Sequence, residues 1–198
     1  MGKFIALEGL DGSGKSYQAK KIVEYLAQKG YKVYNTYEPT EGAIGTLIRR
    51  IQKGEAGEYT EATMLHLYTA DRIEHNKLIK AALDKGEWVI CDRYILSSIA
   101  YQGFEKEHPS PYMLNADLIR PDINIILDIS AGEALKRVHG RDCDPEMYEN
   151  EAFLTKVRQA YESSDRYNSY FGTVWKVDAS KSKEEVTENI IRIIERNI

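Results

Sequence analysis

The segment GLDGSGKS combines glycines with a lysine and a serine at the spacing of a phosphate-binding loop. It matches the pattern G-x-x-x-x-G-K-[ST], in which the glycines let the backbone turn tightly and point N–H groups at phosphate oxygens. In this pattern Lys15 reaches the β- and γ-phosphates of a nucleotide, and Ser16 is a ligand of Mg²⁺. The residues expected to bind the nucleotide are Gly9, Leu10, Asp11, Gly12, Ser13, Gly14, Lys15 and Ser16.

The segments on either side of this loop are those that it requires. The apolar run KFIALEG precedes the loop and is typical of a short buried strand. Ala19, Ile22, Val23 and Leu26 follow at the spacing of one helix face, and Gly30 is expected to end that helix. A helix N-terminus beside the loop adds positive potential for an anion. The alternative, a glycine-rich turn with a solvated lysine, does not account for this context.

GTPases, motor ATPases and small-molecule kinases share such a loop, so other segments must separate them. The guanine-reading pattern N-K-x-D of GTPases is missing from the sequence, and motors or helicases usually need a chain longer than 198 residues. Arg49 and Arg93 lie near strand ends and favour a kinase with a small phosphorylated acceptor, because a planar guanidinium binds phosphate oxygens in pairs. The alternatives are a solvated helix charge for Arg49 and a structural ion pair for Arg93.

Strand-like and helix-like stretches alternate along the chain. The expected strands are KFIALEG, KVYNTYE, EWVICDR, DINIILDI and GTVWKVDA, and the longest helical pattern runs from about residue 60 to residue 85. This alternation predicts an α/β fold with a parallel sheet that is covered by helices on both faces. Ligands of such sheets bind at the carboxyl ends of the strands, so we expect the site in the loops after Glu8, Glu38, Asp92 and Asp128.

Two residues of the long helical pattern are suited to recognise a base. Tyr68 and Arg72 are spaced i, i+4, so both project from one helix face. The tyrosine ring can stack on a base while the guanidinium donates to a carbonyl oxygen at its edge. Such an oxygen disfavours cytosine, which offers an amino donor there. The alternative places Tyr68 in the core and pairs Arg72 with Asp71.

Further polar residues follow the third expected strand. Asp92 ends this strand and is expected to hold Mg²⁺ through water, together with Ser16; the alternative is a structural pair with Arg93 or Lys15. Small hydroxyls after this strand suit the N3 side of a pyrimidine, although serines also cap or line helices. The polar residues at helical spacing after this strand are Ser97, Ser98, Tyr101 and Gln102, of which the two serines carry the small hydroxyls.

Together with the phosphate loop, the segments YEPTEGAIGTLIRR, LYTADRIEH and CDRYILSSIAYQG resemble the thymidylate kinases. The resemblance covers nearly the whole chain, since PDINIILDISAGEALKR and VDASKSKEEV are also similar to parts of that family. It implies a three-layer P-loop kinase fold with a five-stranded parallel sheet, in one domain over residues 1–198. It also implies ATP-dependent phosphorylation of deoxythymidine monophosphate (dTMP) with Mg²⁺, carried out by a homodimer.

The resemblance implies roles for individual residues of the acceptor site. Arg49 and Arg93 would clamp the acceptor phosphate, and Tyr68 and Arg72 would hold the pyrimidine ring and its O4. Tyr101 would crowd the 2′ position of the sugar and so favour deoxyribose. The other residues of the expected acceptor site are Glu38, Pro39, Ser97, Ser98 and Gln102.

A mobile lid is expected near residues 137–150. The transferred phosphoryl group needs a nearby arginine, which this family supplies from the phosphate loop or from the lid. The loop has no arginine here, so we expect Arg141 to act, with Arg137 as the second choice. Asp11 is implied to contact the acceptor 3′-hydroxyl and nearby arginines. The expected catalytic residues are Lys15, Arg93, Arg141 and Asp11.

Three short stretches of the sequence depart from the pattern of the family. Glu146 and Met147 stand where the bacterial lid often carries an Asp-Arg pair. The segment 40–42, Thr-Glu-Gly, replaces a common Gly-Gly-Thr, and Tyr17 replaces a common threonine. Two other functions therefore stay open: a related kinase for dUMP, a broad pyrimidine range or a nucleoside, and a nucleotide-binding module without phosphoryl transfer.

Composition and charge narrow the class of protein. Apolar residues make up 42% and charged residues 29% of the chain, which is a typical soluble composition. The net charge of −4 disfavours a nucleic-acid polymer as partner, and no apolar run reaches the roughly 20 residues of a membrane span. The N-terminus leads directly into a strand pattern, and Cys91 and Cys143 are far apart, so we expect a reduced, cytoplasmic protein without a signal peptide.

Overall fold

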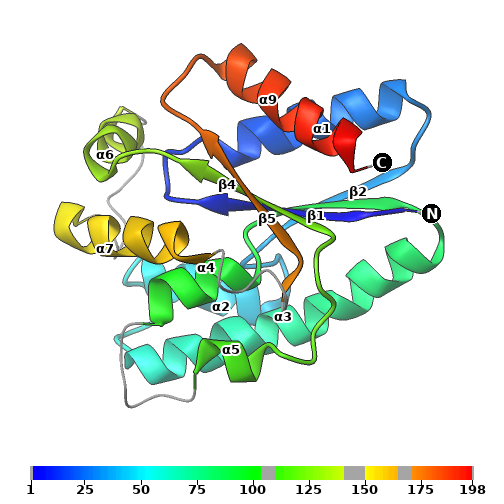
Figure 1. Ribbon diagram of the computed structural model, residues 1–198. Helices are drawn as coiled ribbons and strands as arrows, with labels where there is room; N and C mark the ends of the chain where they lie inside the picture. The colour runs from blue at the N-terminus through cyan, green and yellow to red at the C-terminus, as the bar shows by residue number, and fades with distance from the viewer. Residues whose placement is uncertain (1, 104–109, 141–149, 165–170, 198) are drawn as a thin grey trace.

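The computed structural model describes residues 2–103, 110–140, 150–164 and 171–197 (Figure 1). Five strands form one parallel sheet in the order β2-β3-β1-β4-β5. Their bounds are Phe4–Gly9 for β1, Val33–Tyr37 for β2, Trp88–Asp92 for β3, Ile123–Asp128 for β4 and Thr173–Asp178 for β5. The predicted five-stranded parallel sheet is thereby confirmed, and each strand lies within the apolar run that predicted it.

Helices cover both faces of this sheet, as predicted (Figure 1). Helix α1 (Lys15–Gln28) and helix α9 (Lys183–Arg196) pack against each other on one face. The other face carries α3 (Glu61–Asp84), α4 (Ile95–Gln102), α5 (Pro111–Leu114) and α7 (Glu151–Glu162). Helix α2 (Ala43–Gln52) packs on α3, and α6 (Ala131–His139) follows β4 and contacts α7.

The long helix α3 agrees with its predicted range because its ends carry recognisable signals. Thr60 caps the N-terminus, where its hydroxyl accepts a hydrogen bond from the backbone N–H of Thr63. At the other end Gly86 adopts a left-handed conformation, which a glycine allows at no steric cost. The helix between them presents Tyr68 and Arg72 to the interior of the site.

The strand order brings the predicted loops to one edge of the sheet. The central strand β1 is buried along its whole length, which agrees with its run of apolar residues. It ends at Gly9, and Tyr37 at the end of β2 lies in register with Asp92 at the end of β3. The phosphate loop, the loop after β2 and the segment after β3 therefore meet at this edge. No helix within the described ranges is long and apolar enough to cross a membrane.

Candidate functional site

The phosphate loop packs closely against helix α6. Gly12 has a φ of 81°, and a Cβ at this position would lie 2.3 Å from the carbonyl oxygen of Ala134 on α6. Only a glycine fits there, because both the backbone conformation and the space exclude a side chain. The hydroxyl of Ser13 is buried and has no hydrogen-bond partner among the described residues, so it is available to a ligand of the loop.

Lys15 lies at the start of α1, inside the loop, and its side chain is 6% exposed. Its Nζ donates to the carbonyl oxygens of Leu10 at 2.8 Å and Gly9 at 3.2 Å, and lies 3.9 Å from Asp11. Burial lowers the pKa of Lys15, the positive charge of Arg93 lowers it further, and Asp11 and Asp92 act in the opposite direction. An ammonium group held in this way gains a strong partner when phosphate oxygens enter the loop.

Ser16 and Asp92, which were predicted as oxygen ligands of Mg²⁺, lie within hydrogen-bond distance of each other. The Ser16 hydroxyl donates to Asp92 Oδ2 at 2.7 Å, and both residues line a cavity at the carboxyl edge of the sheet. A hydroxyl and a carboxylate beside open space suit Mg²⁺, which keeps several waters and binds phosphate oxygens. No cluster of three or more His, Cys, Asp or Glu residues that could hold a metal occurs in the described parts of the chain. Any ion here would therefore depend on this pair and on the ligand itself.

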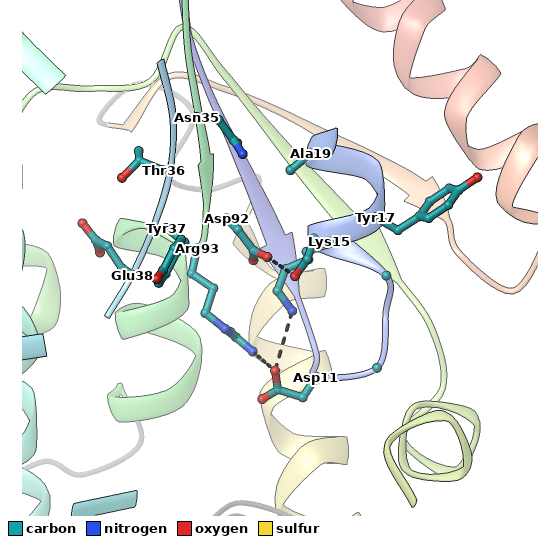
Figure 2. A pocket seen from close by; sticks show the side chains of 13 residues that line it. Asp11, Lys15, Tyr17, Ala19, Asn35, Thr36, Tyr37, Glu38, Asp92 and Arg93 are labelled. Atoms are coloured by element: carbon teal, nitrogen blue, oxygen red, sulfur yellow. Dashed lines mark hydrogen bonds and ion pairs between the residues drawn. The ribbon is translucent and has the colours of Figure 1, made fainter. Parts of the chain in front are cut away.

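This first cavity has a volume of about 600 Å³. Figure 2 shows Asp11, Lys15, Asp92 and Arg93 around it, drawn from the phosphate loop, α1 and the end of β3. Tyr17 points from α1 toward α9, away from these four residues (Figure 2). Its ring lies 5.0 Å from the Nζ atom of Lys183, so cation–π attraction joins it to the first turn of α9.

A second cavity of about 210 Å³ adjoins the first and contains the predicted acceptor residues. All ten of them line it, and Asp11 and Gln52 complete the lining. The ten are Glu38, Pro39, Arg49, Tyr68, Arg72, Arg93, Ser97, Ser98, Tyr101 and Gln102. Three residues border both cavities, namely Asp11, Glu38 and Arg93. The two cavities thus meet where the phosphate loop faces the end of β3.

Arg93 occupies this junction in a constrained geometry. It is the one described residue other than glycine with a positive φ, at 71°. Its Nη2 donates to Asp11 Oδ1 at 2.7 Å, its Nη1 donates to Ser97 Oγ at 3.2 Å, and the guanidinium lies 5.1 Å above the Tyr101 ring. Arg93 thus forms an ion pair, which was the alternative expected for it; the carboxylate partner is Asp11, whereas Asp92 accepts a hydrogen bond from Ser16.

Arg72 is buried on α3, and its guanidinium is held by groups from four other residues. Its Nε donates to Glu38 Oε2 at 2.7 Å, so the alternative pairing with Asp71 is wrong. The remaining bonds run from Nη1 and Nη2 to the Ser98 hydroxyl, the Asn115 side chain and the Tyr94 carbonyl oxygen. These bonds use four of the five N–H donors of a guanidinium. Among the described residues this leaves one Nη2 hydrogen for a ligand in the second cavity.

The opposite wall of the second cavity is less buried. Tyr68 is half-buried and packs against the small apolar cluster of Ile48, Ile51 and Met64, and its hydroxyl accepts a hydrogen bond from Gln52 Nε2 at 3.0 Å. Arg49 is also half-buried, and its Nη1 donates to the carbonyl oxygen of Pro39 at 2.6 Å. Arg50, its neighbour in sequence, is exposed. A freely solvated helix charge, which was the alternative for Arg49, therefore describes Arg50 and not Arg49.

The segment 40–42 replaces the common glycines with a different anchor. The backbone N–H and the hydroxyl of Thr40 donate to the two carboxylate oxygens of Asp71, at 2.7 Å and 2.6 Å. Next to this anchor, a Cβ on Gly45 would lie 2.1 Å from the Thr40 carbonyl oxygen, so α2 approaches the loop closely. The departure from the family pattern thus leaves a loop that is fixed to α3.

The expected lid arginines cannot both be placed. Arg137 is exposed on the last turn of α6. Arg141, Glu146, Met147 and most of the expected lid at 137–150 lie outside the described residues. The choice between Arg141 and Arg137 stays a prediction.

Several residues around the site were not predicted from the sequence. Glu8 is a buried acid in the apolar run of β1, and that contrast is a signal that could have identified it. His75 lies 2.9 Å from Glu38 through its Nδ1, and its spacing of i+3 from Arg72 could have indicated it. Gln52 follows Arg49 at the same spacing. Tyr161 reaches the site from α7, which no local pattern indicates.

Comparison with known proteins agrees with this geometry. A probable thymidylate kinase of Thermococcus gammatolerans is 37% identical over 100% of this chain and 98% of its own length. One from Thermococcus onnurineus is 39% identical over 98% of both chains, and one from Methanocaldococcus jannaschii is 40% identical over 95% of this chain and 93% of its own. The family model described as thymidylate kinase matches residues 7–190, which include every predicted site residue. The chain therefore belongs to the thymidylate kinase family.

Proposed function

We propose that this protein transfers the γ-phosphoryl group of ATP to dTMP in the presence of Mg²⁺, giving dTDP and ADP. The observation that carries this proposal is the junction of two cavities at Asp11 and Arg93. One cavity is bordered by the phosphate loop, and the other is lined by residues suited to a pyrimidine monophosphate. A donor and an acceptor in these cavities would meet at a guanidinium, which is the group that phosphoryl transfer needs there.

In this proposal the residues of the phosphate loop bind and align the donor. Backbone N–H groups and the Lys15 ammonium bind its phosphate oxygens, with the N-terminus of α1 behind them. Ser16 and Asp92 hold Mg²⁺, whose charge offsets that of the phosphates when it is bound. Arg93 contacts the reacting phosphates from the side of the acceptor.

The acceptor requires no general base. A nucleoside monophosphate has its second pKa near 6, so its phosphate is already a nucleophile at pH 7. Catalysis then consists of alignment and charge stabilisation. Arg49 and Arg93 clamp the phosphate, Tyr68 stacks on the base, and the remaining N–H of Arg72 donates to its O4.

The same cavity accounts for the preference for a deoxyribose pyrimidine. Tyr101 lies beneath Arg93, where its ring restricts the space for a sugar 2′-hydroxyl. Ser97, Ser98 and Gln102 supply polar groups, Glu38 borders both cavities, and Pro39 lines the second one. Arg72 offers a donor to the base edge, which a cytosine amino group cannot accept.

The wider assignments follow from the family. We infer one kinase domain over residues 1–198, a lid at 137–150 that excludes water, a homodimer, and a cytoplasmic location with no nucleic-acid polymer or membrane as partner. Arg141 is our first choice for the arginine that stabilises the transferred phosphoryl group, and Arg137 is the second.

An acceptor panel tests the function. With ATP and Mg²⁺, dTMP should give a higher kcat/KM than dUMP, dCMP, dAMP and thymidine. A Lys15→Ala protein serves as the control and should show no acceptor-dependent ATP consumption. Faster turnover of another acceptor would contradict the dTMP assignment, and equal activity in the control would contradict the enzyme assignment.

A second comparison tests the lid. Arg141→Ala should lower kcat much more than it raises the KM for dTMP, whereas Arg137→Ala should have the smaller effect on kcat. A loss confined to KM, or a larger kcat loss in Arg137→Ala, would show that Arg141 is not the acting arginine.

A further inference from the structure

We propose that Glu8 is a positioning residue that holds Arg93 in place, an inference that rests on the proposed function because it assigns the phosphates to Arg93. Glu8 lies near the end of β1 and is 0% exposed. It borders neither of the two cavities, so it cannot contact a donor or an acceptor there. Any effect of Glu8 on the reaction must pass through its neighbours.

The backbone of Arg93 is held by β1. A left-handed conformation in a residue with a side chain persists only when the surroundings impose it. The N–H of Arg93 donates to the carbonyl oxygen of Leu7 at 2.8 Å, and the N–H of Tyr94 donates to Glu8 Oε1 at 3.0 Å. Two consecutive residues of β1 thus accept from the two N–H groups on either side of the strained Cα atom. One of these two acceptors is the Glu8 side chain.

The other oxygen of Glu8 supports the guanidinium of Arg93. Glu8 Oε2 accepts from the Ser97 hydroxyl at 2.5 Å, and Ser97 Oγ in turn accepts from Arg93 Nη1 at 3.2 Å. The Tyr161 hydroxyl on α7 donates to the same Glu8 oxygen at 3.3 Å. The carboxylate therefore fixes both ends of Arg93, through Tyr94 at the backbone and through Ser97 at the side chain.

A role in packing alone does not explain an acid at this position. Burial raises the pKa of Glu8, while the Ser97 hydroxyl and the charge of Arg93 act in the opposite direction. A buried carboxyl group is unfavourable compared with an apolar side chain of similar volume, and the neighbours of Glu8 in β1, such as Leu7, are apolar. We therefore attribute the acid at this position to its two oxygens, which accept the hydrogen bonds that hold the strained Arg93.

Glu8→Gln tests this role while the volume of the side chain is kept. The amide oxygen can still accept from the Tyr94 N–H, but the amide NH₂ group cannot accept from the hydroxyls of Ser97 and Tyr161. We expect dTMP binding, measured by calorimetry, to weaken about tenfold in an otherwise unchanged protein. In an Arg93→Ala background, Glu8→Gln should weaken dTMP binding less than about twofold, because Glu8 acts through Arg93.

Asn124→Ala is the matched control. Asn124 is a buried polar residue of the adjacent strand β4, and its amide donates to the carbonyl oxygen of Phe171 at 2.7 Å, far from both cavities. This variant should lower the melting temperature and leave dTMP binding unchanged. If Asn124→Ala weakens dTMP binding as much as Glu8→Gln does, the effect of Glu8 is one of general stability and the proposal is wrong.

Tyr161→Phe provides a milder variant in case Glu8→Gln does not fold. It removes one donor to Glu8 and should weaken dTMP binding about two- to fivefold in the unchanged background and not in Arg93→Ala. Equal effects in both Arg93 backgrounds, for either variant, would overturn the positioning role. Failure of the unchanged protein to bind dTMP would instead overturn the proposed function itself.

Discussion

Asp11 and Arg93 form a 2.7 Å ion pair between the phosphate loop and the residue that follows β3. The two side chains are 52% and 17% exposed, so water and ligands reach the pair. A monophosphate that binds Arg93 would compete with Asp11 for the guanidinium. Asp11 belongs to the phosphate loop, so a change in its contacts would also affect the loop that is proposed to bind the donor. We therefore expect binding of one nucleotide to alter the affinity for the other, and by linkage the effect should be equal in both directions.

Arg49 and Arg50 provide a direct comparison of two adjacent arginines. Arg49 lines the acceptor cavity and is half-buried, whereas Arg50 is exposed and lies 3.9 Å from Glu55. Loss of a charge-assisted phosphate contact costs about 1.5–3 kcal/mol. Steady-state kinetics of Arg49→Ala should therefore show a KM for dTMP that is about 10- to 100-fold higher. Arg50→Ala should match the unchanged protein, and a similar rise in both variants would place the phosphate elsewhere.

Lys15 is expected to lower the stability of the free protein. Its ammonium is buried and its nearest described carboxylate lies 3.9 Å away, so desolvation is only partly offset. Lys15→Met should raise the melting temperature by about 2–4 °C, equivalent to about 1 kcal/mol, while kcat falls by at least about a hundredfold.

Lys20→Met serves as the control for this prediction. Lys20 is an exposed lysine of the same helix, so the change should leave both the melting temperature and kcat as they are. A lower melting temperature in Lys15→Met, measured by calorimetry without nucleotide, would show that Lys15 stabilises the free fold.

Gly45→Ala should disturb the loop that carries Pro39 and Thr40. The new Cβ would lie 2.1 Å from the Thr40 carbonyl oxygen, and a backbone atom cannot move aside as a flexible side chain can. Overpacking of this kind costs about 1–3 kcal/mol, which urea unfolding would detect. The KM for dTMP should rise as well, because Arg49 donates to the Pro39 carbonyl oxygen.

The control for Gly45→Ala is Gly132→Ala on α6. A Cβ there would lie 3.1 Å from the end of the Glu151 side chain, which can rotate away. This variant should be as stable as the unchanged protein or more stable, because alanine favours a helix by up to about 1 kcal/mol over glycine. If Gly45→Ala behaves in the same way, α2 is not fixed against the loop.

The stability of the protein should fall above pH 9 in part through Tyr101. Burial raises the pKa of Tyr101 to about 12, so the folded protein keeps a proton that the unfolded chain loses from about pH 10. The protonated Tyr101 contributes fully to the free energy of unfolding below about pH 10, and this contribution is lost as the pH rises toward 12. Between pH 9 and pH 11 this loss amounts to about 1.3 kcal/mol.

Tyr101→Phe should remove that part of the pH dependence. Urea unfolding at pH 9 and pH 11 should show a decline in the free energy of unfolding that is smaller by this amount than in the unchanged protein. Tyr59→Phe, at an exposed tyrosine, is the control for the loss of a hydroxyl group. An equal decline in Tyr101→Phe and in the unchanged protein would contradict the assignment.

The strands, the long helix and the phosphate loop could be predicted because their signals are local. β1 is a continuous apolar run, Thr60 and Gly86 mark the ends of α3, and the glycines of the loop have a fixed spacing. The rule that ligands bind at the carboxyl ends of parallel strands then selected the segments after β2 and β3, and the family resemblance selected residues within them.

Contacts between distant segments could not be predicted in this way. Tyr161 and Glu8 are 153 positions apart, and nothing in either segment specifies that α7 passes over the end of β1. The pair of Thr40 and Asp71 likewise depends on how closely the loop after β2 packs against α3. The resemblance implied that Asp11 contacts nearby arginines, but only the fold, which brings together two segments 82 positions apart, shows that Arg93 is its partner at 2.7 Å.

The unequal burial of the two walls of the acceptor cavity has a consequence for directed evolution. On one wall Arg72 donates to Glu38 and also to the buried Asn115, so a library that varies one of these three residues mostly yields unpaired buried groups. On the other wall Tyr68 and Gln52 share a single hydrogen bond near the surface. New base preferences should therefore be selected at Tyr68 and Gln52, with the Arg72 wall kept as an unvaried scaffold.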